Sequence, residues 1–290
     1  WIEHRFSKPR VVGSNPSGRA SLINKIKIIL TLKTIRRKIK KKIPISIRDY
    51  FFVLKHIPKR FKENNQISKF FYDLNCLEIG GPSDLFFTKL YIYQKLKSLS
   101  VANFSDETTW EGNIKEGLNC RYYKNKMAYQ YILDTTNLYK IKDGTFDAIL
   151  SSHSLEHVAN PIKALFEWKR VLKNNGKVLL ILPHKINNFD HKRPYTTFDH
   201  LISDYEKNVS EDDMTHYEEI INLHDRKELR DKNYYEKFLE ESKNNFKNRH
   251  FHHHVFNKDL IFKILEFTGF KVNQYYEHEE DLITLGQIIE

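Results

Sequence analysis

A short apolar run that leads directly into a glycine turn is the feature that most restricts the fold of this 290-residue chain. The run covers residues 76–79, the turn is Gly80-Gly81-Pro82, and a helical pattern extends over residues 84–99. A strand, a glycine turn and a helix with proline in its first turn form the opening βα unit of a doubly wound sheet. Glycine matters here because a residue without Cβ lets the backbone come close to a bound molecule. The pattern predicts an α/β protein.

The same alternation continues along the chain. Further strands are predicted over residues 101–104, 129–133, 145–150 and 176–182, and helices over 109–118, 161–172 and 260–268. Two last strands, 272–278 and 282–289, should pair as a terminal antiparallel hairpin. Strands that alternate with helices indicate a parallel sheet whose ligands bind at the carboxyl ends of the strands. We predict a Rossmann-like α/β fold with a seven-stranded, mostly parallel sheet and an insert after the fifth strand.

Basic residues are concentrated near the N-terminus. Residues 1–69 contain 19 Lys and Arg but 3 Asp and Glu, whereas the other 221 residues contain 29 and 34. The net charge of +11 therefore belongs to the N-terminal part, which argues against a nucleic-acid surface on the remainder. We expect three parts: an over-extended reading frame without periodicity at 1–21, a basic arm at 22–74, and one α/β domain at 75–290 with a cap insert at 184–256.

Residues 22–42 alternate Ile and Leu with Lys and Arg. Such a segment could lie as a helix on an anionic membrane surface, where each basic residue contributes about 1 kcal/mol. It could also contact RNA, although no aromatic residues are interleaved for base stacking, or form a solvated basic helix. Cys76 and Cys120 make no disulfide framework, and no apolar stretch is long enough to cross a bilayer. We expect a cytoplasmic protein whose arm can touch the inner membrane face.

Several motifs together resemble those of a known family. Leu77-Glu-Ile-Gly-Gly-Pro-Ser83 is similar to the first motif of class I S-adenosylmethionine-dependent methyltransferases, and Asp134 is placed like their acidic residue after the third strand. Residues 146–158 resemble their fourth motif, and residues 160–183 resemble the helix, turn and strand that follow it. The resemblance covers residues 75–183 well and 257–290 loosely. It implies S-adenosylmethionine as the cofactor.

The resemblance also implies roles for individual residues. The first loop would bracket the methionine part of the cofactor, through Glu78, Gly80, Gly81, Pro82 and Ser83. A polar residue after the second strand would hold the ribose hydroxyls, the candidates being Asn103, Ser105 and Asp106. Asp134 and the backbone of Thr135 would bind the adenine, although Asp134 could also cap a helix over residues 136–141. The cleft near the sulfonium would be lined by Ser151, Ser152 and His153.

Nine of the fourteen histidines lie in the insert between Pro183 and Asn257. Loops on a rigid scaffold often build concave sites, so we expect the runs at 190–194, 199–200 and 252–254 to face the substrate. A hydroxyl acceptor needs a base, and the pKa of histidine suits that task. The candidates for this base are His157, His184, His191 and His253.

The acceptor is inferred from the same resemblance. The glycine-turn variant and the histidine-rich insert resemble small-molecule and sugar methyltransferases of bacterial surface-polysaccharide pathways. They imply transfer of a methyl group to a small acceptor, a sugar hydroxyl in cell-surface glycan biosynthesis. The sequence leaves the oligomeric state open.

Other interpretations are possible. His153-Ser-Leu-Glu-His157 matches a zinc-protease pattern, but it directly follows a predicted strand, and we predict no metal. The run Ser151-Ser-His-Ser154 replaces the Asn/Asp-Pro-Pro-aromatic run that binds a flipped base, which counts against nucleic acid. One alternative is an RNA-directed methyltransferase that uses the basic arm. Another is a catalytically silent binding protein, because the family's Gly-x-Gly-x-Gly is shortened here and no acidic residue clearly follows the second strand.

Overall fold

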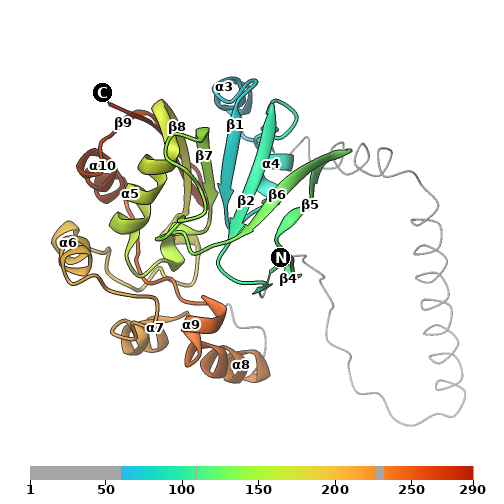
Figure 1. The fold of residues 1–290 in the computed structure, drawn as a ribbon. Helices are drawn as coiled ribbons and strands as arrows, with labels where there is room; N and C mark the ends of the chain where they lie inside the picture. The colour runs from blue at the N-terminus through green and yellow to red at the C-terminus, as the bar shows by residue number, and fades with distance from the viewer. Residues whose placement is uncertain (1–59, 109, 226–231, 290) are drawn as a thin grey trace, which may run out of the picture. The chain divides into compact units, whose positions relative to one another are not determined.

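The computed structural model describes residues 60–108, 110–225 and 232–289, which we call the described body. Its centre is an eight-stranded sheet with the order β5-β6-β2-β1-β7-β8-β10-β9 (Figure 1). The strands of this sheet are β1 (Asn75–Ile79), β2 (Ser98–Asn103), β5 (Gly117–Tyr123), β6 (Lys126–Ile132), β7 (Phe146–Ser152), β8 (Leu172–Pro183), β9 (Phe270–Glu277) and β10 (Asp281–Ile288).

The five central strands, β6, β2, β1, β7 and β8, are all parallel to one another. The edge strand β5 pairs antiparallel with β6, and at the other edge β10 pairs antiparallel with both β8 and β9. The predicted Rossmann-like sheet and its terminal antiparallel hairpin are therefore confirmed. The predicted number of seven strands is wrong by one, because β5 is an additional strand.

The sequence suggested a helix over residues 109–118, and strand β5 begins within the last two residues of that range. That prediction is wrong: in the part of it that the structure describes, the chain contains the short antiparallel pair β3 (Glu107–Thr108) and β4 (Gly112–Asn113), followed by the start of β5. Gly112 and Gly117 have φ of +70° and +131°, in the left-handed region that glycine enters readily and that breaks a helix. The two glycines thus separate short extended segments.

Two other helix predictions also need correction. Helix α4 (Asp84–Thr88) begins as expected with Ser83 as its N-cap but ends far short of residue 99. Tyr91, with φ of +59°, turns the chain into the left-handed region, so the helix cannot continue. Residues 136–141 form turns, because the amide of Leu138 donates to the Glu167 carboxylate and not to a backbone carbonyl one turn earlier.

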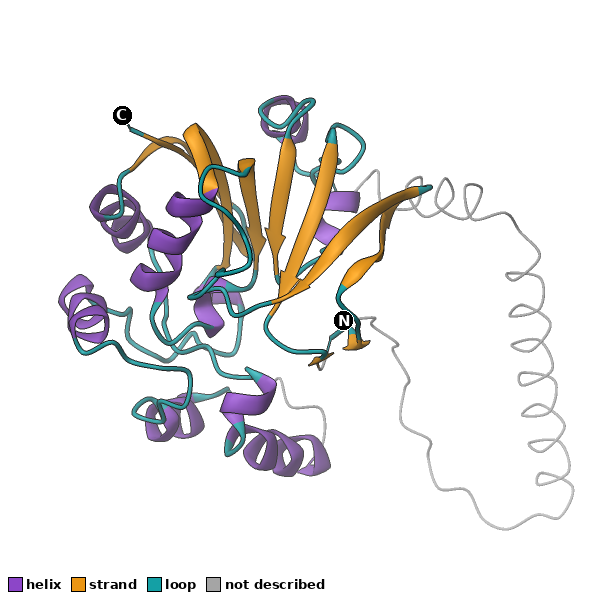
Figure 2. Cartoon of the chain, in the orientation of Figure 1, coloured by secondary structure: helices purple, strands orange, loops and turns teal. Residues whose placement is uncertain are grey.

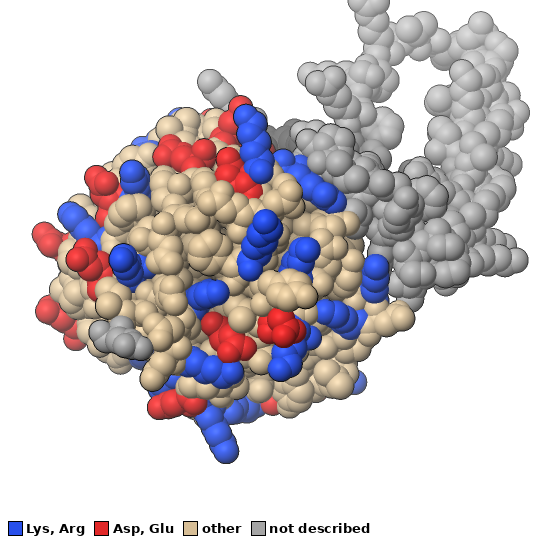
Figure 3. All heavy atoms as spheres, turned by 90° about the horizontal axis from the view of Figure 1, so that it is seen from above, with Lys and Arg blue, Asp and Glu red and all other residues tan. Residues whose placement is uncertain are grey.

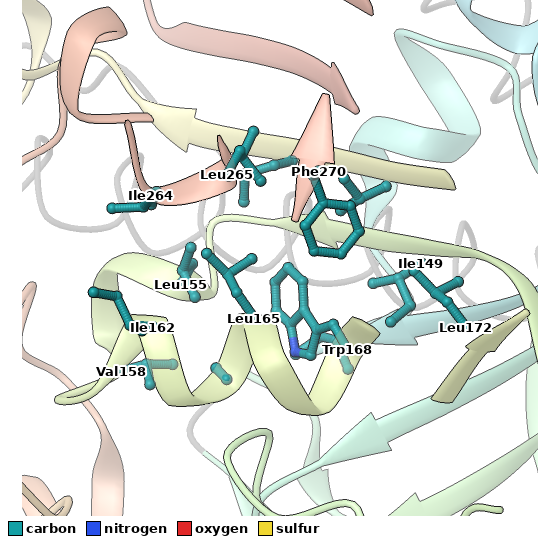
Figure 4. Packing of buried hydrophobic residues seen from close by; sticks show 14 of the residues in the cluster. Ile149, Leu155, Val158, Ile162, Leu165, Trp168, Leu172, Ile264, Leu265 and Phe270 are labelled. Atoms are coloured by element: carbon teal, nitrogen blue, oxygen red, sulfur yellow. The ribbon is translucent and has the colours of Figure 1, made fainter. Parts of the chain in front are cut away.

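The remaining helices of the α/β framework agree with their sequence patterns. Asn160 caps α5 (Pro161–Val171) by accepting a hydrogen bond from the amide of Lys163, and Asn257 caps α10 (Lys258–Phe267) in the same way. Both helices pack on one face of the sheet, where Trp168 is fully buried among aliphatic side chains and Phe270 (Figure 4). A second apolar cluster lies on the other face and includes Phe71 and Phe86.

The second cluster also contains residues that precede the first strand. Helix α3 (Asn64–Lys69) contributes Ile67, and Phe61 and Phe71 on either side of that helix are buried in the same core. These residues belong to the predicted basic arm, so its last part packs on the sheet. The proposed extension at 1–21 and residues 22–59 of the arm lie outside the described residues.

The insert after β8 forms a cap of short helices. After the 3-10 turn η3 (Lys185–Asn187) come α6 (Phe198–Glu206), α7 (Tyr217–Leu223), α8 (Lys232–Ser242) and α9 (Asn245–Asn248). The cap helices lie beyond the end of the sheet toward which β1 and β2 point (Figures 1 and 2). Acidic and basic side chains are intermixed on the face of the body in Figure 3. Among the described residues, no helix is long and apolar enough to cross a membrane.

Candidate active site

The structure gathers the predicted cofactor residues at one edge of the sheet. Strands β6, β2, β1 and β7 are neighbours and run parallel, so their carboxyl ends meet at that edge. In open α/β sheets, ligands bind in the crevice outside these ends. The residues that follow the four strands are Gly80, Gly81, Pro82 and Ser83 after β1, Asp106 after β2, Asp134 and Thr135 after β6, and His153 after β7.

The carboxylate of Glu78 organises the glycine turn. Its Oε1 accepts a hydrogen bond of 2.8 Å from the amide of Ser83, and its Oε2 accepts one of 2.8 Å from the hydroxyl of Tyr93. The side chain is fully buried, and burial raises the pKa of Glu78 to about 8. A Cβ on Gly81 would lie 2.2 Å from Cδ of Glu78, so only glycine fits there. One carboxylate oxygen of Glu78 therefore holds the turn, and the other holds the side chain of Tyr93.

Gly80 joins this turn to the segment after β7. It has φ of +74°, and a Cβ there would lie 2.3 Å from Oγ of Ser154. That hydroxyl donates to the carbonyl of Ile79 at 3.0 Å. The backbone of the first loop and the end of β7 thus approach so closely that a side chain at Gly80 would separate them.

The end of β2 supports the turn from its other side. Asn103 is buried and its Nδ2 donates to the carbonyl of Gly81 at 2.9 Å, while its Oδ1 has no hydrogen-bond partner. Asp106 is exposed, and the Ser105 hydroxyl accepts a hydrogen bond from the amide of Glu107. Of the three predicted ribose ligands, Asn103 positions the loop and Asp106 remains open to solvent.

Asp134 connects the end of β6 with the cap. Its Oδ1 accepts hydrogen bonds from the amide and the hydroxyl of Thr136, so it caps a turn and no helix follows. Its Oδ2 lies 2.9 Å from Nη2 of Arg249. The Thr135 hydroxyl accepts a hydrogen bond of 2.7 Å from the indole of Trp168. The side chain of Thr135 is therefore engaged in the core, and only its backbone is available to a ligand.

Arg249, which the sequence analysis did not single out, closes the cap over this edge. Besides Asp134 it forms an ion pair with Glu211, and its guanidinium lies 4.9 Å from the centroid of the Phe104 ring. Glu211 in turn accepts a hydrogen bond from the amide of Ala159. Burial raises the pKa of Glu211 to about 7, although the charge of Arg249 opposes that shift. Nothing in the sequence pattern around this lone arginine indicated such a contact.

The segment after β7 is polar and partly unsatisfied. Ser151 is fully buried and its hydroxyl has no partner, whereas Ser152 accepts a hydrogen bond from Ser154 through its carbonyl. His153 has φ of +50°, and its Nε2 lies 2.8 Å from Oδ1 of Asp281 on β10. Burial alone would lower the pKa of His153, but the hydrogen bond to Asp281 and the charges of Glu156 and Asp281 together outweigh it and raise the pKa.

His157 lies next to a buried carboxylate. Its Nδ1 lies 2.7 Å from the carbonyl of Phe251, so Nδ1 carries the proton and Nε2 has a free lone pair. This Nε2 lies 3.9 Å from Oε1 of Glu156, whose two carboxylate oxygens are buried without any hydrogen-bond partner. The ring of His252 packs 4.7 Å from that of His157. Burial, with the charge of His252, lowers the pKa of His157 well below its usual value.

The other three predicted catalytic histidines lie in separate surroundings. Nε2 of His184 lies 3.3 Å from Glu277 on the terminal hairpin, and its Nδ1 is buried without a partner. His191 is part-exposed and lies 3.5 Å from Asp225. His253 is fully buried, with Nε2 at 3.0 Å from the side-chain amide of Asn245. Of the four candidates, His157 alone contacts the Glu156 and His252 pair.

The run at residues 190–194 contains a buried hub. Arg193 is 1% exposed, and it donates to the carboxylates of Asp190 at 2.9 Å and Glu219 at 2.8 Å. It also donates to the carbonyls of His252 at 2.7 Å and His253 at 3.2 Å. These bonds tie the start of the cap to its end. Asp190 and Arg193 of this run therefore support the cap from inside, whereas His191, Lys192 and Pro194 are exposed.

The sequence of the central strands matches a known family. Residues 113–180, which run from the end of β4 through β5, β6, β7 and α5 into β8, match the family described as "Methyltransferase domain". This match covers β6 and β7 of the edge described above, with Asp134 and residues 146–158, whereas β1, β2 and the glycine turn precede it. Residues 113–180 are 68 of the 290 residues, so the match identifies part of a methyltransferase domain within the described body.

Individual proteins resemble this methyltransferase domain more distantly. An uncharacterized protein of Methanocaldococcus jannaschii is 50% identical over 44 residues, which are 15% of this chain and 19% of that protein. Three solved structures are similar in fold. A SAM-dependent methyltransferase from Aquifex aeolicus is 13% identical, with 81% of this chain and 97% of that chain covered and a TM-score of 0.40. An S-adenosylmethionine-dependent methyltransferase from Mesorhizobium loti is 11% identical, with coverages of 75% and 92% and a TM-score of 0.43.

The third structure contains bound ligands. It is the 1,6-didemethyltoxoflavin-N1-methyltransferase of Burkholderia thailandensis, with 1,6-didemethyltoxoflavin and S-adenosylhomocysteine. It is 8% identical, with 97% of this chain and 94% of that chain covered and a TM-score of 0.41.

The edge of the methyltransferase domain is suited to a polar cofactor. Buried polar atoms without a protein partner lie at the ends of β2 and β7, namely Oδ1 of Asn103 and Oγ of Ser151. Such atoms are costly unless a ligand or water satisfies them. Two surface hollows of about 630 and 670 Å³ lie at the amino ends of the strands, beside Gly144 and Asn175, and include none of the site residues. The unsatisfied atoms lie among the predicted cofactor residues, and the two hollows lie away from them.

Proposed function

We propose that this methyltransferase transfers the methyl group of S-adenosylmethionine to a hydroxyl of a small acceptor, a sugar in cell-surface glycan biosynthesis. The observation that carries the proposal is the orientation of His157, whose Nδ1 is held by the Phe251 carbonyl while its Nε2 lies beside Glu156. The polar, histidine-rich lining suits an acceptor that is rich in hydroxyl groups. The sugar assignment rests in addition on the motif resemblance.

The cofactor would be held by the residues that follow the four parallel strands. The loop of Gly80 and Gly81 would face its methionine part, Asp106 its ribose, and the backbone of Thr135 its adenine. Ser151, Ser152 and His153 would line the cleft beside it. When bound, S-adenosylmethionine supplies an electrophilic methyl group, and the protein has to align the acceptor with it.

His157 is the best-placed general base. An acceptor oxygen can gain a methyl group only if it also loses its proton, and the free lone pair on Nε2 of His157 can take that proton. Because its pKa is lowered, His157 is neutral and ready to accept at neutral pH. The carboxylate of Glu156, 3.9 Å away, would stabilise the imidazolium that forms. His252 would close the same pocket from the cap.

The other three predicted catalytic histidines remain predictions, and we assign them lesser roles than that of the base. His184 lies at the end of β8 and could contact the acceptor from the hairpin side. His191 and His253 have partners within the cap, Asp225 and Asn245, so we assign them to its support. The proposed contact of residues 22–42 with the inner membrane face lies outside the described residues.

A substitution at His157 tests this proposal. The full chain would be assayed with S-adenosylmethionine on a panel of nucleotide sugars and glycans, and methylated products would be identified by mass spectrometry. On the best acceptor, His157→Gln should lower kcat by about 10²–10⁴-fold, the usual contribution of a general base, without changing the affinity for S-adenosylhomocysteine. His278→Gln, which alters a histidine of the β9–β10 turn that lies beside Glu63, should keep full activity.

Three outcomes would contradict the proposal. Full turnover by His157→Gln would remove His157 from the reaction. Methylation of RNA or of amines, with no product on any hydroxyl acceptor, would overturn the acceptor class. Binding of S-adenosylhomocysteine with no turnover on any acceptor would favour a silent binding protein.

A further inference from the structure

Four side chains in the cap, distinct from the group of Glu156, His157 and His252, bring metal-ligand atoms together. They are His200, Asp204, His216 and His254, and one ligand atom of each lies within 4.8 Å of those of the others. His200 and Asp204 are one turn apart on α6, His216 is the N-cap of α7, and His254 belongs to the segment that precedes α10. Three separate parts of the cap therefore converge on one point.

The distances within this group suit a coordinated ion. Nε2 of His200 lies 3.1 Å from Nε2 of His216 and 3.2 Å from Oδ2 of Asp204. Two ligands about 2.0–2.1 Å from a tetrahedral zinc ion are about 3.3 Å apart. The ring of His254 lies beside these atoms, with its Nε2 at 3.9 Å from Oδ2 of Asp204.

Hydrogen bonds alone leave this group unsatisfied. The Nε2 atom of His200 has only one lone pair or one proton, yet it faces both a second imidazole nitrogen and a carboxylate oxygen. Oδ2 of Asp204 is buried and has no hydrogen-bond partner. A cation placed between the three atoms would satisfy all of them at once.

The hydrogen bonding of the His254 ring is that of a metal-bound histidine. It is 1% exposed, and its Nε2 lies 3.1 Å from the carbonyl of Ala159. A proton on Nε2 leaves the lone pair on Nδ1, and that atom is buried without a partner. Metal-bound histidines commonly donate their other ring proton to a carbonyl, which fixes the tautomer.

We propose that His200, Asp204, His216 and His254 bind one divalent transition-metal ion, for which zinc is the best match. Imidazole nitrogens suit zinc, and four protein ligands leave no open position. A closed site of this kind is structural. It would clamp α6, the start of α7 and the segment around His254 to one another. The argument for this ion does not depend on the proposed methyl transfer.

The clamp would act on the acceptor side of the molecule. The segment that contains His254 also contains His252, whose ring packs against that of His157. Fixing one end of this segment would hold His252 in place. Removing the ion should loosen the cap without disturbing the glycine turn, which is anchored to Glu78 in the sheet.

Metal analysis of the full chain tests the proposal. The protein would be purified without a polyhistidine tag, its metals measured by inductively coupled plasma mass spectrometry, and the chelator-treated protein titrated with Zn²⁺ alone. We expect about one zinc ion per chain, and at least a tenfold loss of zinc affinity in His216→Gln and in Asp204→Asn. His250→Gln, a matched cap histidine that lies beside Glu241, should bind zinc as the unaltered protein does. With Co²⁺ in place of zinc, the visible spectrum should show the intense bands of tetrahedral coordination.

Two results would contradict the proposed metal site. A folded, chelator-treated protein that takes up no Zn²⁺ would overturn the site, and the cobalt spectrum makes this decision on the unaltered chain even if a variant fails to fold. Zinc that survives His216→Gln and Asp204→Asn but is lost in His252→Gln would place the ion with Glu156, His157 and His252 instead.

Discussion

The sheet and the cap of this protein are held together by different forces. In the sheet, β7 and β8 are packed by apolar side chains such as Trp168, whose burial depends on area and not on direction. In the cap, Arg193 and Arg249 are buried and bind carboxylates and carbonyls through directed contacts. The apolar framework carries the cofactor loops, and the polar cap brings histidines and carboxylates over them.

This difference has consequences for stability. An apolar core loses stability in proportion to the volume that is removed, whereas a buried ion pair fails when either partner is lost, because the other charge remains uncompensated. Substitutions in the sheet should therefore destabilise the whole domain. Substitutions in the cap should open that region and leave the sheet folded.

The largest effect is expected at Trp168. Trp168→Ala should lower the free energy of unfolding by about 3–5 kcal/mol, because a fully buried indole and its hydrogen bond to Thr135 are lost. Guanidinium denaturation followed by circular dichroism measures this change. The control is Trp110→Ala, since Trp110 is 46% exposed and should matter far less. Equal losses for the two variants would show that the core around α5 is not packed as described.

Arg193 should have the next largest effect, confined to the cap. Arg193→Met leaves the buried carboxylate of Asp190 without its guanidinium and should cost about 3 kcal/mol of local stability. Limited proteolysis should then cut within residues 184–256 while the affinity for S-adenosylhomocysteine is kept. Lys192→Met, which removes a half-exposed cation beside Asp225, is the matched control and should leave the cap protected. Loss of cofactor affinity in Arg193→Met would end the distinction between cap and sheet.

Glu78 should affect how the free energy of unfolding depends on pH. Its pKa is raised from 4.5 to about 8 in the folded protein, so the folded state binds more protons than the unfolded state between these values. The contribution of Glu78 is therefore fully present below pH 4.5 and is lost as the pH rises through 8. Glu78→Gln should remove this slope, so that the stability difference between the two proteins changes by about 3–4 kcal/mol between pH 5 and 8. Parallel pH profiles for the two proteins would contradict the burial effect.

The smallest effect is expected on the surface of the sheet domain. Lys173 pairs with Asp147 at 2.7 Å, but its side chain is 46% exposed. Lys173→Gln should change the free energy of unfolding by less than about 0.5 kcal/mol, and less still in high salt, because water and ions screen the pair. A larger loss would mean that directed polar contacts also stabilise the sheet.

The sequence predicted the apolar framework well. The runs at residues 145–150 and 176–182 and the hairpin at 272–289 appear as strands because their burial follows from composition and period alone. The failures lie where polar contacts or left-handed residues decide the backbone. Tyr91 ends a helix that its pattern would have continued, and the carboxylate of Glu167 keeps residues 136–141 from becoming helical.

The candidate site could be predicted only as far as its strands. Residues at strand ends, such as Asp134 and His153, are placed by the sheet and could be named in advance. Arg249 and Glu211 could not, because their pairing depends on how the cap folds back over 37 intervening residues. The histidines of the insert were noticed as a group, but periodicity says nothing of which ring faces which carboxylate.

Calorimetric titration of the protein with S-adenosylhomocysteine tests the central claim, the cofactor site at the carboxyl ends of β1, β2, β6 and β7. Gly80 and Gly144 both have positive φ, +74° and +62°, but a Cβ meets Ser154 at 2.3 Å in the first case and nothing closer than 4.0 Å in the second. We predict micromolar binding by the unaltered protein and by Gly144→Ala, and at least a tenfold loss in Gly80→Ala. No binding by the folded, unaltered protein, or equal binding by Gly80→Ala, would contradict the account.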